Sequence, residues 1–186
     1  MEKSTKVLYK CIQGRYVKIT WTHKIQERQA EINFIKSKRV KNVTCFLSAI
    51  TTGGALSSIM PFLDSQIPTI LTAIFALCLS YYTIRFRDGQ LEENAKENKS
   101  FAAKMHDLRN RYESLMSEIL AEIYTDEQII ERKDRLEQLE KEYYENAPHT
   151  SKYAVEQAEQ ALKTKKESIT EEKEIEAIVP KDLIVQ

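Results

Sequence analysis

The residues best suited to catalysis or to metal binding are scattered along this sequence. Histidine and cysteine supply many of the general bases, nucleophiles and zinc ligands in proteins. They occur here at His23, His106, His149, Cys11, Cys45 and Cys78, with no metal-binding or disulfide spacing among them. The sequence also contains no phosphate-binding glycine loop and no nucleophile elbow. It therefore predicts a protein that is not an enzyme and that holds no metal and no cofactor.

Small and hydroxyl-bearing side chains form a second chemical pattern, two stripes within an apolar region. At about 100° per residue, the spacing keeps each stripe on one side of a helix. The stripes are Thr44, Ser48, Thr51, Ala55 and Ser58, then Thr69, Thr72, Ala76, Ser80 and Thr83. Such residues let membrane helices approach closely and hydrogen-bond to each other. They equally suit a hydrated path, which would need several copies around an axis because two helices enclose no lumen. Both interpretations stay open.

The segments that carry these stripes have the length and composition of membrane spans. Residues 42–63 and 65–84 contain no charged side chain, and Asp64 lies between them. A helix of about 20 residues rises roughly 30 Å, the hydrocarbon thickness of a bilayer. We therefore predict a transmembrane helix over 42–63, a short external link over 64–68 and a second transmembrane helix over 69–86. The alternative is a hairpin buried in a soluble protein, for which the flanks offer too little apolar surface.

Basic residues flank this region on both sides and are absent from the link. They are Lys36, Lys38, Arg39 and Lys41 before it and Arg85 and Arg87 after it. Because short loops rich in Lys and Arg stay in the cytoplasm, both termini are expected there. The whole chain balances 28 Lys plus Arg against 28 Asp plus Glu, so direct nucleic-acid binding is not expected.

The flanks predict long helices, since only four glycines and four prolines occur in 186 residues. Residues 1–41 form an N-terminal helical segment, and residues 87–165 form a second cytoplasmic helical region. Within that region, an apolar stripe has heptad spacing: Phe101, Met105, Leu108, Tyr112, Leu115 and Ile119. This stripe either packs against the N-terminal helix of the same chain or joins copies of the chain. The expected fold is all-α, a transmembrane helical hairpin plus cytoplasmic helices with coiled-coil-like packing.

Local signals divide the cytoplasmic region further. Thr125 followed by two acidic residues resembles a helix start, and Pro148 ends the helix predicted over 126–145. That helix is expected to return antiparallel to the heptad helix, and a last helix follows over about 151–166. Residues 166–186 form a charged tail for which flexibility is favoured over a docked peptide at its apolar end.

Four segments taken together resemble the SLATT family, the SMODS- and SLOG-associating two-transmembrane effectors of bacteria. The segments are WTHKIQE at 21–27, the hairpin at 43–84, YYTIR at 81–85 and YYENAPH at 143–149. The resemblance covers most of residues 15–165 and implies a multi-pass protein of the inner membrane. It also implies a conflict-system partner, either a nucleotidyltransferase that makes a nucleotide signal or a reverse transcriptase or other sensor. The family has no catalytic residues to transfer to this chain.

Two functions are compatible with these features. The first is an antiviral effector whose copies oligomerise and perforate or depolarise the inner membrane when a sensor is activated. The second is a membrane-anchored helical scaffold that recruits a cytoplasmic partner through residues 101–145 without forming a pore. The lipid bilayer, further copies of the chain and a sensor protein are the expected partners.

Overall fold

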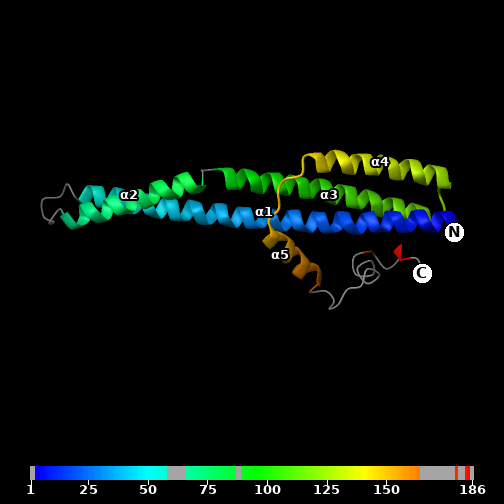
Figure 1. The fold of residues 1–186 in the computed structure, drawn as a ribbon, viewed down its shortest axis with the longest axis horizontal. Helices are drawn as coiled ribbons and strands as arrows, with labels where there is room; N and C mark the ends of the chain where they lie inside the picture. The colour runs from blue at the N-terminus through cyan, green and yellow to red at the C-terminus, as the bar shows by residue number, and fades with distance from the viewer. Residues whose placement is uncertain (1–2, 58–65, 87–88, 164–178, 180–182, 185–186) are drawn as a thin grey trace. The chain divides into compact units, whose positions relative to one another are not determined.

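The protein consists of α-helices, and the described part of the chain contains no strand. The computed structural model describes residues 3–57, 66–86, 89–163, 179, 183 and 184 (Figure 1). Its helices are α1 (Lys3–Ser57), α2 (Gln66–Phe86), α3 (Gln90–Leu120), α4 (Asp126–Glu145) and α5 (Lys152–Lys163). The predicted all-α class is confirmed.

The chain divides into two compact units. Unit 1 comprises Met1–Ala30 and Lys96–Gln186, and unit 2 comprises Glu31–Ala95. Helix α1 continues without a break through residue 41, where the sequence predicts the change from the N-terminal segment to the first membrane span. The physical reason is local, because residues 36–42 contain no glycine or proline and are rich in Lys and Arg, which are good helix formers.

The core of unit 1 is enclosed by the first half of α1, by α3 and by α4. From α1 come Tyr9, Ile12, Tyr16 and Ile19, all buried. The six residues of the heptad stripe are at most 4% exposed and pack into the same core: Phe101, Met105, Leu108, Tyr112, Leu115 and Ile119. The stripe is therefore buried within one chain, and it leaves no free surface that could join copies in this fold.

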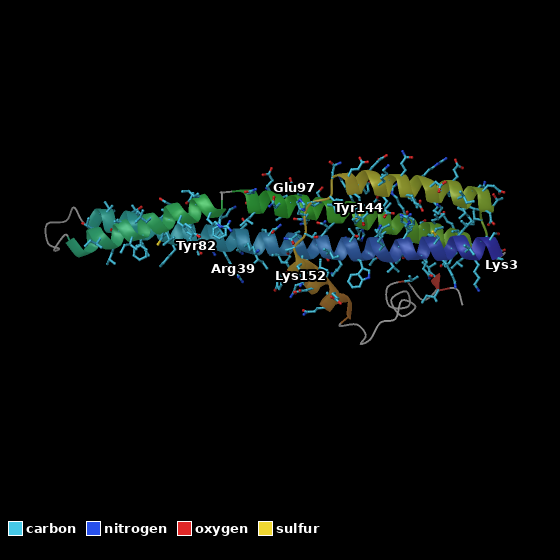
Figure 2. All side chains as sticks on the ribbon, in the orientation of Figure 1. Lys3, Arg39, Tyr82, Glu97, Tyr144 and Lys152 are labelled. Atoms are coloured by element: carbon cyan, nitrogen blue, oxygen red, sulfur yellow. The ribbon has the colours of Figure 1, made fainter. Side chains whose placement is uncertain are left out.

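Helix α4 lies antiparallel to α3, as predicted. The rings of Phe101 and Tyr144 lie 6.1 Å apart, centroid to centroid. At the other end of the pair, Arg132 approaches Glu118 at 3.9 Å. The side chains between these helices can be followed in Figure 2, where Tyr144 is labelled on α4.

The start of α4 confirms the predicted signal at Thr125. Its hydroxyl accepts a hydrogen bond from the backbone N–H of Gln128, and the Gln128 side chain accepts one from the backbone N–H of Thr125. This reciprocal capping box satisfies donors that would otherwise lack partners in the first turn. Ile129 follows directly and is buried in the core, so the cap fixes where α4 enters unit 1.

The described residues near the C-terminus contact the core of unit 1, although the sequence favoured a flexible tail. Val179 and Leu183 are buried, and Ile184 packs against the same cluster. The hydroxyl of Tyr9 donates a hydrogen bond to the carbonyl oxygen of Leu183, and the Gln13 amide donates to the same oxygen at 3.5 Å. These residues therefore match the alternative prediction, a docked peptide at the apolar end of the tail. The rest of the predicted tail lies outside the described residues.

Unit 2 is an antiparallel pair formed by the second half of α1 and by α2. Gly54, near the end of α1, lies against Thr72, near the start of α2. Val40 and Val43 of α1 share a groove with Tyr82 at the other end of α2. Helix α2 begins at Gln66, three residues before the predicted start at 69. The predicted link around Asp64 lies outside the described residues.

Among the described residues, one helical stretch is long and apolar enough to cross a membrane. It starts at Thr69 in α2, and none of its apolar window is buried. The first predicted span, over 42–63, extends past Ser57 and so runs out of the described residues.

Candidate functional site

The helix pair of unit 2 carries an extensive exposed apolar surface. Its exposed large side chains are Phe46, Leu56, Ile70, Leu71, Ile74, Leu77, Tyr81 and Ile84, of which Ile84 is 80% exposed. Contiguous apolar surface of this kind on a protein marks a site of contact with a membrane or another protein. On α2 these side chains recur three or four residues apart, which places them along one face of that helix.

The predicted stripe on α1 is only partly covered by α2. Thr44, Ser48 and Thr51 are half-buried and Ala55 is exposed, while Ser58 lies outside the described residues. The hydroxyl of Thr51 donates a hydrogen bond to the Leu47 carbonyl at 2.8 Å. Such a bond to the preceding turn satisfies the hydroxyl without any partner on another helix.

The stripe on α2 divides between the helix pair and the open surface. Thr72 and Ala76 are half-buried, whereas Thr69, Ser80 and Thr83 are exposed. The hydroxyl of Thr83 donates to the Leu79 carbonyl at 2.9 Å. Part of each stripe is therefore half-buried, and the rest of the described stripe residues are exposed.

The two helices approach each other closely at Gly54. A Cβ atom built there would lie 2.1 Å from Oγ1 of Thr72, which is too close for a real contact, and 3.2 Å from its Cβ, which is tight. A Cβ at the adjacent Gly53 would meet nothing within 4 Å. Small residues permit this kind of approach between membrane helices. The Gly53-Gly54 pair was visible in the sequence, but only the structure shows which glycine faces α2.

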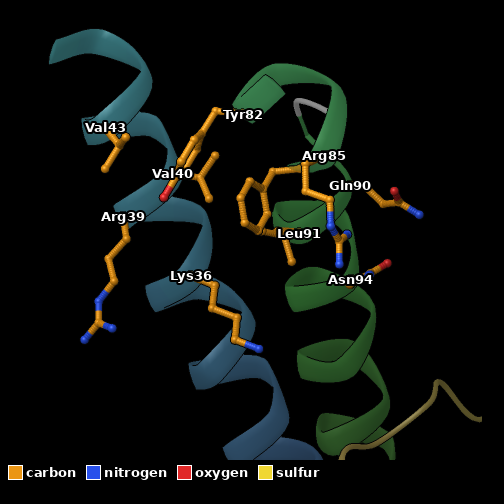
Figure 3. Close-up of a pocket in the computed structure, with 10 residues that line it drawn as sticks. Lys36, Arg39, Val40, Val43, Tyr82, Arg85, Gln90, Leu91 and Asn94 are labelled. Carbon is orange, nitrogen blue, oxygen red and sulfur yellow. The ribbon is translucent and has the colours of Figure 1, made fainter. Parts of the chain in front are cut away.

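A basic groove lies at the end of the same pair, where α2 ends and α3 begins (Figure 3). It encloses about 520 Å³ and is lined by Lys36, Arg39, Val40, Val43, Tyr82, Arg85, Phe86, Gln90, Leu91 and Asn94. In the sequence, Lys36, Arg39 and Arg85 indicate only that both termini face the cytoplasm. The structure gathers them around one cavity with an apolar floor.

In unit 1, two of the four segments that carry the family resemblance meet each other. The hydroxyls of Thr22 and Tyr144 lie 2.7 Å apart, at hydrogen-bond distance. The Gln26 amide donates to the Pro148 carbonyl at 3.1 Å, and Asn98 on α3 donates to the Gln26 side-chain oxygen at 2.7 Å. The motif at 21–27 and the motif at 143–149 are thus two sides of one polar junction. Because Gln26 and Asn98 are buried, these bonds are costly to break.

The junction continues to the start of α5. The side-chain oxygen of Gln29 accepts hydrogen bonds from the backbone N–H of Ser151 at 2.7 Å and from its hydroxyl at 2.8 Å. The Ser151 hydroxyl in turn accepts from the Ala154 N–H at 3.2 Å, which caps α5. The chain after Pro148 is therefore held against α1 by side-chain hydrogen bonds.

One carboxylate is buried in unit 1 together with its cations. Glu140 is 3% exposed and lies 3.1 Å from Arg15 and 3.5 Å from Lys18. Glu137 adds a second carboxylate 3.3 Å from Arg15. Burial by itself would lower the pKa of Arg15, but the two carboxylates outweigh it and raise that pKa. This cluster has the features of a structural ion pair that docks α4 on α1.

Two of the three histidines come together in space despite their separation in the sequence. The rings of His23 and His106 lie 5.4 Å apart, centroid to centroid, and Nδ1 of His23 lies 2.9 Å from the Ala102 carbonyl oxygen. Burial lowers the pKa of His23. Within the described residues, no group of three or more His, Cys, Asp or Glu side chains is placed to hold a metal ion.

Comparison with known families identifies the family of this chain. The model of SMODS and SLOG-associating 2TM effector domain family 4 matches residues 8–174. The chain belongs to this SLATT family. No curated protein and no solved structure matches it. Family membership, together with the apolar helix α2, makes this SLATT chain a membrane effector domain of conflict systems. The SLATT match covers unit 2 and most of unit 1, so the polar junction and the helix pair are parts of one family domain.

Proposed function

We propose that copies of this SLATT chain oligomerise in the inner membrane and perforate or depolarise it when a partner sensor is activated. The observation that carries the proposal is the placement of hydroxyls on the helix pair of unit 2. Thr69, Ser80 and Thr83 remain exposed on a surface that is otherwise apolar. In an assembly, such hydroxyls face either a neighbouring copy or water.

The stripes suit a hydrated path made by several copies. Hydroxyl groups can contact water inside a membrane without the cost of burying a charge. Thr44, Ser48 and Thr51 are half-buried at the edge of the helix pair, where a second copy would complete the lining. One pair has no lumen, so the proposal requires an oligomer around an axis.

The trigger in this proposal comes from another protein. The sequence contains no recognisable nucleotide cradle and no catalytic constellation. We therefore place a nucleotidyltransferase, a reverse transcriptase or another sensor upstream of the SLATT chain. Both termini would face the cytoplasm, where such a sensor reaches unit 1.

The test substitutes the stripe on α1 and measures membrane potential in cells that express the chain with its activator. Ser48→Leu with Thr51→Leu is expected to abolish depolarisation while membrane insertion is retained. Ser48→Ala with Thr51→Val removes both hydroxyls at nearly constant volume, and it is also expected to abolish depolarisation. If either double variant depolarises cells as the parent does at equal expression, the hydrated path is wrong.

A matched control uses another face of the same helix. Ala49 and Thr52 are exposed and lie outside the stripe. Ala49→Leu with Thr52→Leu adds the same kind of bulk toward lipid, and it is expected to leave depolarisation intact. The scaffold alternative makes a different prediction, because a scaffold depolarises the membrane with no combination of partners.

A further inference from the structure

We propose that the basic groove of unit 2 binds the phosphate headgroup of an anionic phospholipid in the cytoplasmic leaflet. The groove is built from residues 36–43 of α1, the end of α2 and the first turns of α3. This inference rests on the membrane insertion in the proposed function, and it adds a ligand to a surface to which that function gives no role.

Two cations of the groove, Lys36 and Arg85, approach one space between the helices (Figure 3). In Figure 3, Lys36 and Arg85 extend from opposite walls toward the space between the helices, whereas Arg39 points away from that space on the other side of α1. Among the described residues, none of the three pairs with a carboxylate, whereas nearby Lys41 forms an ion pair with Glu92. Positive charge therefore remains available at the groove for an anion. Arg and Lys from two sides are the usual partners of a phosphate group.

The floor of the groove is apolar. Val40, Val43, Tyr82, Phe86 and Leu91 supply it, and Tyr82 points toward Val40 on the facing helix (Figure 3). A free inorganic anion has no apolar part that could pack on this floor, whereas the glycerol and upper acyl carbons of a lipid would cover it. A cavity of about 520 Å³ is within the usual range for a small-molecule site.

The position along the chain matches the headgroup layer. The groove begins where the apolar segment of α1 begins and ends where the apolar helix α2 ends. Tyr82 and Phe86 are aromatic residues of the type that collect at membrane interfaces. Basic pockets between membrane helices on the cytoplasmic side are suited to anionic headgroups. The charge of the groove, its apolar floor and its expected depth in the bilayer all favour an anionic lipid as the ligand.

The test measures lipid retention on the full chain in a neutral detergent. The protein is incubated with equimolar phosphatidylglycerol and phosphatidylcholine, and bound lipids are counted by native mass spectrometry. The parent is expected to retain phosphatidylglycerol preferentially. Each Lys or Arg near an anionic surface is worth roughly a fivefold factor in affinity. Arg85→Gln should therefore reduce the preference about fivefold, and the triple variant Lys36→Gln, Arg39→Gln, Arg85→Gln should abolish it.

A control variant removes the same charge elsewhere. Lys10, Lys99 and Lys141 are exposed in unit 1, and their triple replacement by Gln should leave the lipid preference unchanged. The inference is overturned if the groove variant keeps the parental preference or if this control loses it equally. It is also overturned if inorganic phosphate or glycerol phosphate competes as well as phosphatidylglycerol, since the groove would then be a site for soluble phosphates.

The two proposals fail separately. A chain that depolarises cells but shows no groove-dependent lipid preference retains the proposed function and loses this inference. A chain that inserts and prefers phosphatidylglycerol through the groove but never depolarises cells retains the inference and loses the proposed function.

Discussion

Tyr9 and Tyr112 are both fully buried in unit 1, but their hydroxyls differ in hydrogen bonding. The Tyr9 hydroxyl donates to the Leu183 carbonyl, whereas the Tyr112 hydroxyl has no hydrogen-bond partner among the described residues. Burying an unsatisfied polar group costs about 1–3 kcal/mol. Tyr112→Phe should therefore leave the free energy of unfolding unchanged or raise it, while Tyr9→Phe should lower it by about 1 kcal/mol. Thermal unfolding followed by circular dichroism compares them; equal losses would contradict the assignment.

His23 gives unit 1 a defined pH dependence. Burial lowers its pKa below the ordinary 6.5, against opposing effects of the Ala102 carbonyl and Glu27, and with Arg109 and His106 adding positive charge nearby. Below about pH 6.5 the folded protein therefore binds fewer protons than the unfolded chain. The contribution of His23 to the free energy of unfolding is complete above about pH 6.5, and it is lost as the pH falls below that value.

The measurement is the unfolding temperature of unit 1 between pH 5 and pH 7.5 in buffers of equal ionic strength. His23→Gln retains a donor for the Ala102 carbonyl and should flatten the profile. His106→Gln removes one of the smaller effects that lower the pKa of His23, so it should reduce the slope less than His23→Gln does. A His23→Gln profile as steep as the parent's would show that another group titrates.

At the scale of the helices, Gly54 and Gly53 make a matched pair. Gly54→Ala places a Cβ 2.1 Å from the Thr72 hydroxyl oxygen, so α1 and α2 must separate or Thr72 must rotate. Overpacking of this kind costs about 1–3 kcal/mol. Gly53→Ala meets nothing within 4 Å and should be neutral or stabilising, because alanine is the better helix former. Thermal stability in detergent should rank the two variants in that order.

A second substitution tests whether Thr72 is the cause. Thr72→Ala removes the hydroxyl and methyl atoms that face Gly54. Combined with Gly54→Ala, it should recover part of the lost stability, which makes the two changes non-additive. Additive losses would place the strain of Gly54→Ala somewhere other than this contact.

Helix content and helix starts were readable from the sequence because they depend on neighbours along the chain. Thr125 resembled a helix start in the sequence, and the helix at Asp126–Glu145 has the predicted bounds. The heptad stripe also showed which face of α3 is apolar, but not which surface covers it. That choice depends on contacts between residues far apart, such as Tyr16 with α3, and periodicity carries no information about them. For the same reason, the sequence did not predict that His23 lies near His106 or that Gly54 faces Thr72.

At the scale of the whole molecule, the two units bury their apolar residues differently. Unit 1 encloses its large side chains in a core, and its buried Gln26, Asn98 and Glu140 are hydrogen-bonded or ion-paired. Unit 2 exposes many of its large apolar side chains, including Leu77 and Ile84. In water alone, the exposed apolar side chains of unit 2 would be unfavourable, whereas the buried core of unit 1 is what water favours. Lipid around unit 2 and water around unit 1 account for both.

This division predicts a topology for the whole chain. Lys and Arg lie before and after the apolar region and none lies between the two halves, so residues near Asp64 should be outside the cytoplasm and both termini inside. Alkaline phosphatase fused beside Asp64 should be active, since it folds only outside the cytoplasm, while the same enzyme fused after Gln186 should be inactive. Green fluorescent protein at these positions should give the opposite pattern. An active phosphatase at Gln186, or a silent one beside Asp64 in a protein that remains in the membrane fraction, would mean that the two halves do not cross the bilayer as a pair, and the proposed pore would lose its geometry.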